Sequence, residues 1–583
     1  MHEAKVIPET TTRDLDNAIA DEKGSQQSSS VLDNHEHVVG GFQRGVQNIE
    51  AITLTWTTTS LIVAFCLIWL VYFIQGLIAG TNGSLVPYIT SDFAAHSLTA
   101  TTAVMSSVIS GVTNLTIAKI MDVFGRPHGF FTCVVLATLG LIMSAACTNI
   151  EAYAASQVFY TVGINGVGYS MTVLIADLTT LRNRALVQTL CASGQIITAW
   201  LGGPISTAFL NGAGWRWALG MESILLPSIT LPLLGLFMHY YLKAKRQGVV
   251  PQRISQPTIL KSLSYYAQEF DVMGLLLVSA GIAFLLLPFN LYAMQAKSWS
   301  SPLIIIFLVL AVVFLIAAGI WETYFAKITF VPWKLMSDRM VAGACLLGFA
   351  LFLSNMCWGL YLSSILQVNN NMSVTTASYV VQMYTVVGFG FAIGVGALIS
   401  RTGIFKSITL YFAIPLTLLG AGLLIFFRQS NGHPGYIIMC QLFTSIGGGT
   451  IMITDEIAIL AAVKEQQHFA MAIALVSMFS SIGSAVGLTL SAAIWQDIFP
   501  KSLAMYLPDE EHEHLMMIYS DLTMQLSYEI GSPTRLAIQQ AYGEGQKYLY
   551  TAATASLALA VVAVLMWRNT NVKEVKQTVG RVF

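Results

Sequence analysis

The sequence predicts an all-α protein that crosses a membrane many times. Among its 583 residues, 55% are hydrophobic and only 10% are charged, whereas soluble globular proteins carry about 25% charged residues. Apolar runs long enough to cross a bilayer recur along the chain, and the basic residues gather in alternate connecting segments. This composition excludes a soluble multi-domain enzyme, and the net charge of −1 offers no basic surface to a nucleic acid.

About fourteen transmembrane helices are expected, because a helix needs about 20 apolar residues to cross a hydrocarbon core of about 30 Å. In chain order they lie near residues 59–80, 97–117, 129–148, 152–175, 185–208, 217–241, 271–293, 302–322, 341–364, 376–399, 407–427, 435–460, 467–495 and 548–567.

The positions of the basic residues orient these helices. Of the 29 Lys and Arg residues, 23 lie in the alternate segments that include both ends of the chain. Cytoplasmic segments carry such an excess, so we expect both termini in the cytoplasm. We expect the protein to act as a monomer in the lipid bilayer of the plasma membrane, with endosomal vesicles as the alternative location.

Polar segments divide the chain into regions. The acidic, Ser- and Gln-containing N-terminus has the composition of a disordered tail. The expected regions are a tail over 1–55, a six-helix bundle over 56–241, a cytoplasmic loop over 242–270, two inserted helices with a loop over 271–339, a second six-helix bundle over 340–567 that includes an outer loop at 496–547, and a tail over 568–583.

No metal site, cofactor or catalytic centre is expected. The seven cysteines all lie in apolar stretches without a CxxC pair, which is typical of buried small hydrophobic residues. A His- and Glu-containing run at 510–514 is expected to be solvated. The sequence contains no recognisable nucleophile–base arrangement and no glycine-rich phosphate loop.

The connection after the second span carries a motif at residues 118–127. Asp122 stands at a helix end, and Arg126 follows Gly125, which permits a tight turn. The segment resembles motif A of the major facilitator superfamily, although Ala118, Val123 and Pro127 depart from that pattern. The resemblance implies that Asp122, Gly125 and Arg126 form a conformational latch between helix ends. An ordinary basic cytoplasmic loop is the alternative.

A degenerate second copy of this motif at 400–406 falls between the tenth and eleventh expected spans. Together the two copies suggest the major facilitator fold, with two six-helix bundles plus two extra helices. Repeated halves of this kind form alternating-access transporters with a site near the membrane midplane.

Further segments are similar to those of the fungal siderophore-iron transporter family, and the similarity covers about residues 55–570. The outer-loop segments are the more specific ones. The similar segments are 177–184, 214–217, Asp455-Glu456, 499–501, 526–528, 531–535 and 541–543. The resemblance implies proton-coupled uptake of ferric hydroxamate siderophores, so the expected partners are a ferric siderophore and protons.

Three acidic residues fall inside expected spans, where acids are costly and usually functional. They are Glu222 in the sixth span and Asp455 and Glu456 in the twelfth. No Lys or Arg lies within an expected span to neutralise them. We therefore predict that they take part in proton coupling. Alternatively, they are helix-end acids wetted by a vestibule.

A bulky, polar chelate requires a site that mixes aromatic groups with uncharged hydrogen-bonding groups. The candidates inside the expected spans are Gln75, Asn114, Tyr160, Asn165, Tyr169, Asn355, Trp358, Tyr361, Gln382, Tyr384 and Gln441. Any one of them can instead hold helices together. Tyrosines in or beside the outer loop are candidates for a gate, or else pack within a folded cap; they are Tyr519, Tyr528, Tyr542 and Tyr548.

Two other functions remain open at this point. One is a proton-coupled exporter or exchanger of drugs, organic ions or glutathione. The direction of transport would distinguish it from a carrier for uptake. The other is a non-transporting receptor on the same fold, which would bind ligand without net flux. Fold alone does not decide among them.

Overall fold

The protein folds as a bundle of long helices. The computed structural model describes residues 56–92, 99–247, 271–292, 297–326, 333–428, 433–463 and 468–573, together with Gln268 and Gln295. No strand occurs in these ranges. The predicted N-terminal tail, most of the cytoplasmic loop at 242–270 and the end of the C-terminal tail lie outside them.

Six helical segments make up what we call the first half. Each connection from the second to the fifth has only two or three residues, and the fifth segment is built from three successive helices, α7 to α9. The elements are α3 (Thr58–Asp92), α4 (Thr99–Val123), α5 (Arg126–Ala146), α6 (Ile150–Leu178), α7 (Leu181–Ala192), α8 (Gly194–Thr198), α9 (Gly202–Asn211) and α10 (Trp215–Arg246).

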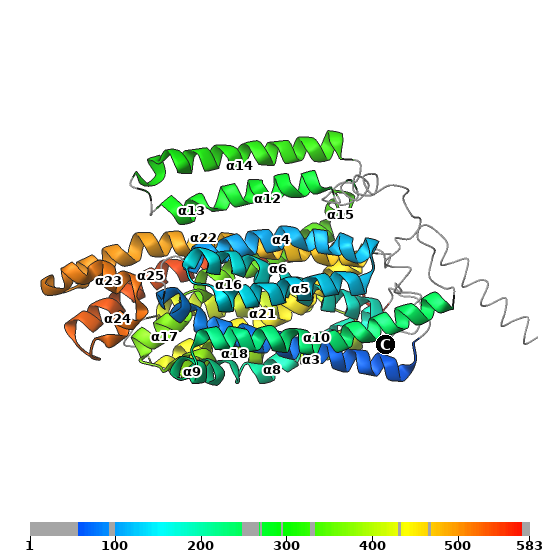
Figure 1. The fold of residues 1–583 in the computed structure, drawn as a ribbon, viewed down its shortest axis with the longest axis horizontal. Helices are drawn as coiled ribbons and strands as arrows, with labels where there is room; N and C mark the ends of the chain where they lie inside the picture. Colours follow the sequence, from blue (N-terminus) through cyan, green and yellow to red (C-terminus); the bar gives the residue numbers. More distant parts are fainter. Residues whose placement is uncertain are drawn as a thin grey trace, which may run out of the picture.

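The second half repeats this plan in the later part of the chain (Figure 1). A π-helical turn at Thr409–Ala413 joins α19 to α20. The elements are α16 (Arg339–Gly359), α17 (Leu362–Asn370), α18 (Val374–Thr402), α19 (Lys406–Ile408), α20 (Ile414–Phe427), α21 (Pro434–Ala462), α22 (Phe469–Tyr506), α25 (Pro533–Ser556) and α26 (Ala558–Met566).

Twelve helices in the described ranges are long and apolar enough to cross a membrane. Two of the predicted spans are not among them. The span at 97–117 corresponds to the Thr- and Ser-rich α4, and the span at 271–293 corresponds to α12 (Val272–Leu286), which has only 15 residues. The count of fourteen spans therefore stays a prediction.

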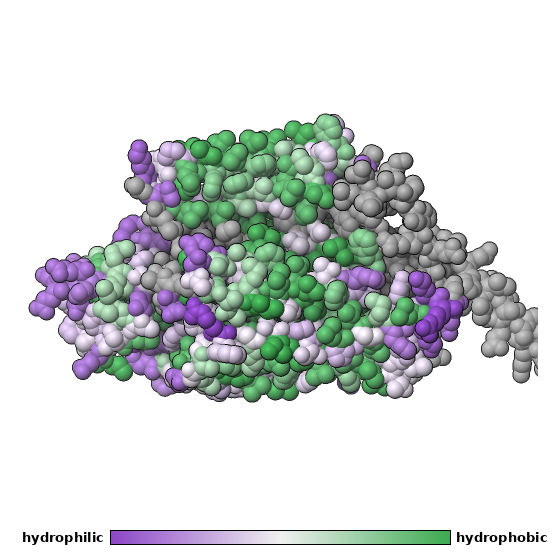
Figure 2. Space-filling view, in the orientation of Figure 1, coloured by the Kyte–Doolittle hydropathy of each residue, from purple (hydrophilic) through white to green (hydrophobic). Residues whose placement is uncertain are grey.

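The two inserted helices lie against the seam between the halves. Helix α12 packs on α14 (Pro302–Ile320) and also contacts α4 of the first half and α22 of the second, and Figure 1 shows the pair along one side of the bundle. The outer face of α14 is exposed and apolar, with Ile306, Val309 and Ile316 each more than half exposed. Figure 2 shows this face as part of a broad hydrophobic region with hydrophilic surface at both ends. A lipid environment satisfies such a face.

The predicted outer loop at 496–547 is largely helical rather than irregular. Helix α22 continues to Tyr506, two short helices follow, α23 (Leu515–Ser520) and α24 (Leu522–Ser527), and α25 begins at Pro533 behind the N-cap Ser532. The last predicted span, which begins at 548, therefore lies within a longer helical segment that begins at Pro533. We call residues 507–532 the cap.

Glycines set the close packing of α5 on α6. A Cβ atom on Gly163 would lie 2.1 Å from the Ala137 amide nitrogen, and one on Gly140 would lie 2.3 Å from the Tyr160 amide nitrogen. Such distances are far below van der Waals contact, so a side chain at either position must push the two helices apart. Small residues at helix interfaces allow this approach in membranes.

We expect Gly163→Ala to destabilise the protein by about 1–3 kcal/mol, the usual cost of overpacking. The melting temperature of detergent-solubilised protein measures the effect. Gly235→Ala is the matched control, because a Cβ there meets nothing within 4 Å and alanine favours the helix. Equal melting temperatures for the two variants would contradict the packing described for α5 and α6.

Candidate functional site

A cavity of about 630 Å³ lies between the two halves, within the range of small-molecule sites. We call it the central cavity. Residues from α3, α4, α6 and α8 line it on the first half, and residues from α16, α21 and α22 line it on the second. The first wall carries amides and tyrosines, and the second carries two carboxylates and four serines, Ser477, Ser480, Ser481 and Ser484.

Five of the predicted substrate residues line the central cavity, and all belong to the first half: Gln75, Asn114, Tyr160, Asn165 and Tyr169. Gln75 donates to the Ile164 carbonyl at 3.0 Å, and Asn165 donates to Ser110 Oγ at 2.9 Å. The Asn114 Oδ1 atom has no hydrogen-bond partner in the described ranges. This wall therefore presents oriented amides together with an unused acceptor.

The other six predicted substrate residues do not line the central cavity. Tyr384 lines a smaller neighbouring pocket, and Trp358 packs edge-on against it at 6.0 Å between ring centroids; Asn355 also interacts with Tyr384. Tyr361 stacks on Trp495 at 4.2 Å below the cap. Gln382 accepts a hydrogen bond from Thr385.

Gln441 is the last of the six predicted substrate residues that do not line the central cavity. It is fully buried, and neither of its amide atoms has a hydrogen-bond partner among the residues described.

Asp455 and Glu456 lie side by side in the sequence on α21, and both line the central cavity. Asp455 is 5% exposed, and its Oδ1 atom has no hydrogen-bond partner in the described ranges. Gly348 on α16 leaves room beside it, because a Cβ there would lie 2.6 Å from Ser480 Oγ and 3.3 Å from Asp455 Oδ2. A carboxyl group is thus held at the cavity wall, and no salt bridge to it occurs in the part of the chain that the structure describes.

Glu456 has a basic neighbour, contrary to the expectation that no base lies within a span. Arg184 is buried inside α7, where its guanidinium donates to the Ala176 and Thr179 carbonyls and lies 4.7 Å from the Phe469 ring centroid. Its charge acts on both Glu456 and Asp177. Hydropathy placed Arg184 in a loop because a helix boundary cannot be located to within a few residues.

Glu222 is fully buried in α10 and does not line the central cavity. It interacts with Asn82 of α3 and lies near enough to Tyr153 and Tyr160 to act on them electrostatically. Neither carboxyl oxygen has a well-formed hydrogen bond among the described residues. Since Tyr160 lines the cavity, Glu222 stands one side chain behind its wall. Sequence reasoning missed Asn82, because position 82 fell in an expected loop and is helical.

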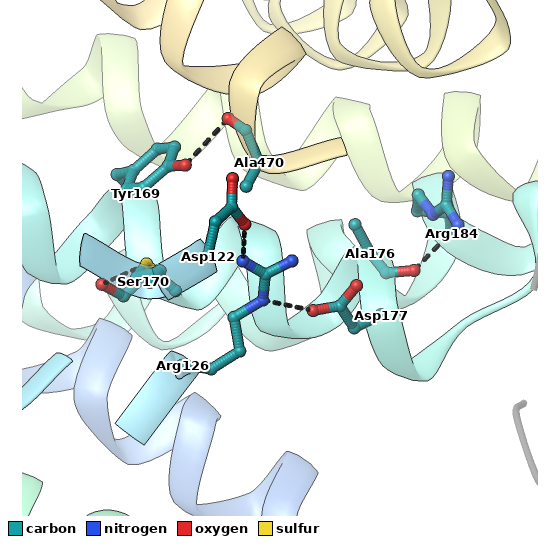
Figure 3. Close-up of polar contacts among 9 residues, drawn as sticks. Asp122, Arg126, Tyr169, Ser170, Ala176, Asp177, Arg184 and Ala470 are labelled. Atoms are coloured by element: carbon teal, nitrogen blue, oxygen red, sulfur yellow. Dashed lines mark hydrogen bonds and ion pairs between the residues drawn. The ribbon is translucent and has the colours of Figure 1, made fainter. Parts of the chain in front are cut away.

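Arg126 pairs with two acids at the end of the bundle opposite the cap (Figure 3). Its Nη1 atom donates to Asp122, and its Nε atom donates to Asp177 Oδ2 at 3.0 Å. All three side chains are at most 3% exposed. Gly125 adopts a φ of 104° immediately before α5, which suits glycine. Asp177 was not predicted as a member of this latch, because it is 51 residues away in the sequence.

The second motif copy has a different structure. Gly403 adopts a φ of 79° at the end of α18, so the turn is repeated. Lys406 Nζ donates to the Trp567 carbonyl at 2.6 Å, and the Val572 amide donates to the Gly403 carbonyl at 3.1 Å. Backbone contacts with the C-terminal segment therefore stand where the first copy has an ionic cluster.

Polar contacts join the halves on both sides of the central cavity. At the latch end, Tyr169 donates to the Ala470 carbonyl at 2.8 Å (Figure 3), and Arg182 donates to the Ser400 carbonyl at 3.2 Å. At the cap end, Tyr88 donates to Gln367 Oε1 at 3.2 Å. There, Ser84 also pairs with Ser378 at 3.1 Å, and Thr207 pairs with Thr375 at 3.0 Å. The two halves are therefore in contact at both ends of the central cavity.

Three of the four predicted gate tyrosines pack in or against one aromatic cluster under the cap. Tyr542 lies edge-on to Phe499 at 4.9 Å and donates to Gln525 Oε1 at 2.8 Å. Tyr519 lies 6.1 Å from the same ring, and Tyr528 packs against the cluster. Tyr548 lies outside it and is 48% exposed.

Two further contacts hold the cap in place. Tyr528 donates to Glu511 Oε2 at 2.9 Å, and burial and Glu511 raise the pKa of Tyr528 to about 12, so the phenol keeps its proton. Arg535 donates to the carbonyls of Gln525 and Gln367. Among the described residues, no group of three or more His, Cys, Asp or Glu side chains is placed to hold a metal ion.

The sequence is similar to those of known membrane transport proteins. The profile of the Major Facilitator Superfamily matches residues 68–362. A protein named MFS siderochrome iron transporter 1 from Ajellomyces capsulatus is 44% identical and aligns over 97% of this chain and 96% of its own length. MFS siderochrome iron transporter D from Aspergillus fumigatus is 40% identical over 93% and 90% of the two chains. Siderophore iron transporter mirB from Emericella nidulans is 38% identical over 93% and 89%.

Solved structures of similar fold include the peptide transporter POT in complex with sulfate, with a TM-score of 0.52, 14% identity and coverage of 90% of this chain and 99% of that one. A bacterial homologue of the human lysosomal transporter Spinster, in an inward-facing and unoccupied conformation, has a TM-score of 0.52, 11% identity and coverage of 88% and 98%. These two structures show the fold alone.

Proposed function

Because the chain belongs to the Major Facilitator Superfamily, and within it to the family of fungal siderophore-iron transporters, we propose that it carries ferric hydroxamate siderophores into the cell in symport with protons. The proposal rests on similarity over nearly the whole chain to proteins named as siderochrome or siderophore iron transporters. The chain is a membrane transporter rather than an enzyme.

The central cavity supports a substrate of this class. Its size suits a small chelate, and its walls combine amides and tyrosines with serines and two carboxylates. Hydroxamate chelates expose carbonyl and amide groups around a shielded iron, so neutral hydrogen-bonding groups suit them better than a second set of metal ligands. Gln75, Asn114 and Asn165 are the residues that we propose bind the chelate.

Transport requires the halves to rock about this cavity. We propose that the Asp122–Arg126–Asp177 cluster, together with Gly125 and the Tyr169 contact to Ala470, holds one end closed. The proposed outer gate comprises the Tyr88–Gln367 contact and the cap. Tyr519, Tyr528 and Tyr542 support the cap, and Tyr548 lies at the exposed edge of the gate. The basic-residue pattern favours a cytoplasmic latch end and cytoplasmic termini in the plasma membrane.

Proton coupling is assigned to Glu222, Asp455 and Glu456. Asp455 and Glu456 reach the cavity directly, so their protonation can respond to the chelate. Glu222 interacts with Asn82 and acts on Tyr160, and Tyr160 lines the cavity, so we propose that Glu222 acts on the cavity through Tyr160. An inward proton gains about 2.3 kcal/mol per 100 mV of membrane potential, which drives accumulation of the chelate.

Uptake of radiolabelled iron in fungal cells that lack their own siderophore transporters tests this proposal. Cells expressing the protein should take up a ferric trihydroxamate with saturable kinetics, and a protonophore should abolish accumulation because it removes the driving force. Absence of uptake from several hydroxamates, with the protein present at the cell surface, would overturn the proposal. Proton-dependent efflux would instead favour the exporter or exchanger, and saturable binding without flux would favour the receptor.

A further inference from the structure

A second pocket opens beside the central cavity. It has a volume of about 280 Å³ and lies between α3, α6, α7 and α8 of the first half and α18 and α21 of the second. The two spaces share part of their lining, so they are continuous. The shared residues are Tyr72, Gly168, Thr172, Gln195, Met452 and Glu456. We call the smaller space the side pocket.

The side pocket is too small for a whole chelate and has a different lining. Sites for complete ligands usually span about 300–1,000 Å³, so 280 Å³ suits one part of a ligand. Beyond the shared residues, its walls are mainly aliphatic, aromatic or small, including Ala192, Phe389, Ala392 and Ile453. An apolar group therefore gains free energy by leaving water for this space.

The polar groups at the mouth of the side pocket largely satisfy each other. The Gln188 Nε2 atom donates to the Tyr72 hydroxyl and to Thr172 Oγ1, at 3.1 Å each. The Gln188 Oε1 atom is buried without a hydrogen-bond partner in the described ranges. The side pocket thus combines a mainly apolar lining with two acceptors, the Gln188 Oε1 atom and the shared carboxylate of Glu456, which suits an acyl group that ends in a hydroxyl.

Close helix packing keeps the floor of the side pocket free of side chains. A Cβ on Gly449 would lie 2.4 Å from the Gly388 carbonyl oxygen, and one on Gly448 would lie 2.3 Å from the Tyr384 hydroxyl. A Cβ on Gly388 itself meets its first neighbour, the Ser445 carbonyl oxygen, only at 3.4 Å. An alanine at 388 therefore fits in ordinary contact with the α21 backbone and narrows the side pocket, which residue 388 lines.

We propose that the side pocket is a specificity site, which receives one apolar, hydroxyl-ended acyl arm of the chelate while the iron core occupies the central cavity. This inference rests on the proposed function, since it names the part of that same substrate which the smaller space selects. The continuity of the two spaces at Tyr72, Gln195 and Glu456 favours this occupant over a separate molecule.

The test compares two ferric trihydroxamates built on the same cyclic hexapeptide. One carries acetyl groups on its hydroxamates, and the other carries branched, hydroxyl-ended alkenoyl groups. In Ala392→Leu the KM for uptake of the long-armed chelate should rise by about tenfold, equivalent to about 1.4 kcal/mol, while the KM for the acetyl chelate changes by less than about twofold. Gly388→Ala should act in the same direction and more weakly.

The matched control is Gly390→Ala on the same helix, where a Cβ meets nothing within 4 Å; it should leave both KM values unchanged. If the KM rises equally for the two chelates, the pocket is filled by lipid or is purely structural, and the inference is overturned. An unchanged KM for the long-armed chelate also overturns it. If the unmodified protein takes up neither chelate, the proposed function itself fails.

Discussion

Arg126→Met should abolish uptake, because it removes the cation that pairs with the buried carboxylate of Asp122 and that also donates to Asp177. Removing one partner of a buried ionic cluster costs about 3–5 kcal/mol, a large part of the stability of a typical domain. We expect little protein at the cell surface, which immunoblotting of surface-labelled cells measures. Arg126→Lys should recover part of the protein, since a lysine restores the charge without the two-sided geometry of the guanidinium.

A second variant separates folding from latching. Replacing the whole cluster, with Asp122→Asn, Arg126→Gln and Asp177→Asn together, removes its three charges at once, while Arg184 keeps its interaction with Glu456. This should cost less stability than removing one partner alone, which leaves a buried charge uncompensated. This triple variant should reach the surface and still lose uptake by about 5- to 150-fold, the usual range of conformational coupling. Wild-type uptake in the triple variant would show that the cluster serves folding alone.

An exposed ion pair provides the control for charge loss. Lys501 pairs with Asp497 at 2.6 Å on α22, with both side chains more than half exposed. Surface pairs contribute about 0–1 kcal/mol, so Lys501→Ala should leave both surface expression and uptake within about twofold of wild type.

The sequence predicted those parts of the structure that depend on local pattern. Apolar runs located the long helices, because membrane burial requires them whatever the tertiary packing. The pairing of Asp122 with Arg126 followed from a spacing of four residues at a turn that glycine permits. The same reasoning failed at Pro533, where a capped helix begins with a polar stretch that hydropathy assigns to a loop.

Sequence reasoning located polar lining residues on both walls of the central cavity, with Asp455 and Glu456 on the second wall. Gln75, Asn114 and Asn165 were found because neutral polar residues inside spans are uncommon and face the interior. The interactions of Asp177 with Arg126 and of Arg184 with Glu456 were not predicted, because the partners lie in distant segments and only packing brings them together. The side pocket had no sequence signal at all, because its lining of small and apolar residues is what any helix interface contains.

Asp455→Asn should uncouple transport from protons, because Asp455 lines the central cavity with its Oδ1 atom unpartnered among the described residues, and the amide cannot take up a proton. We expect concentrative uptake of the chelate to fall by about 5- to 150-fold, the range of a coupling free energy of about 1–3 kcal/mol. Exchange of external labelled chelate for internal unlabelled chelate needs no net proton flux, so it should continue. Both rates can be measured in the same proteoliposomes.

The three acids should differ in this assay. Glu456→Gln also removes the interaction with Arg184, so it should impair exchange as well as concentrative uptake. Glu222→Gln leaves the cavity lining intact and should lower concentrative uptake with an unchanged KM, since its carboxyl group acts from behind Tyr160. Asp497→Asn, an exposed acid on α22, is the matched control.

Loss of exchange and uptake together in Asp455→Asn, with normal surface expression, would assign Asp455 to chelate binding rather than to protons. Full concentrative uptake in all three variants would remove these acids from the coupling step. The contrast among them matters more than any single loss, because a binding defect lowers both rates and a coupling defect lowers only the concentrative one. Asp455 and Glu456 both line the central cavity, and Glu456 also interacts with Arg184, so we expect the protonation of Asp455 to depend more strongly on the chelate.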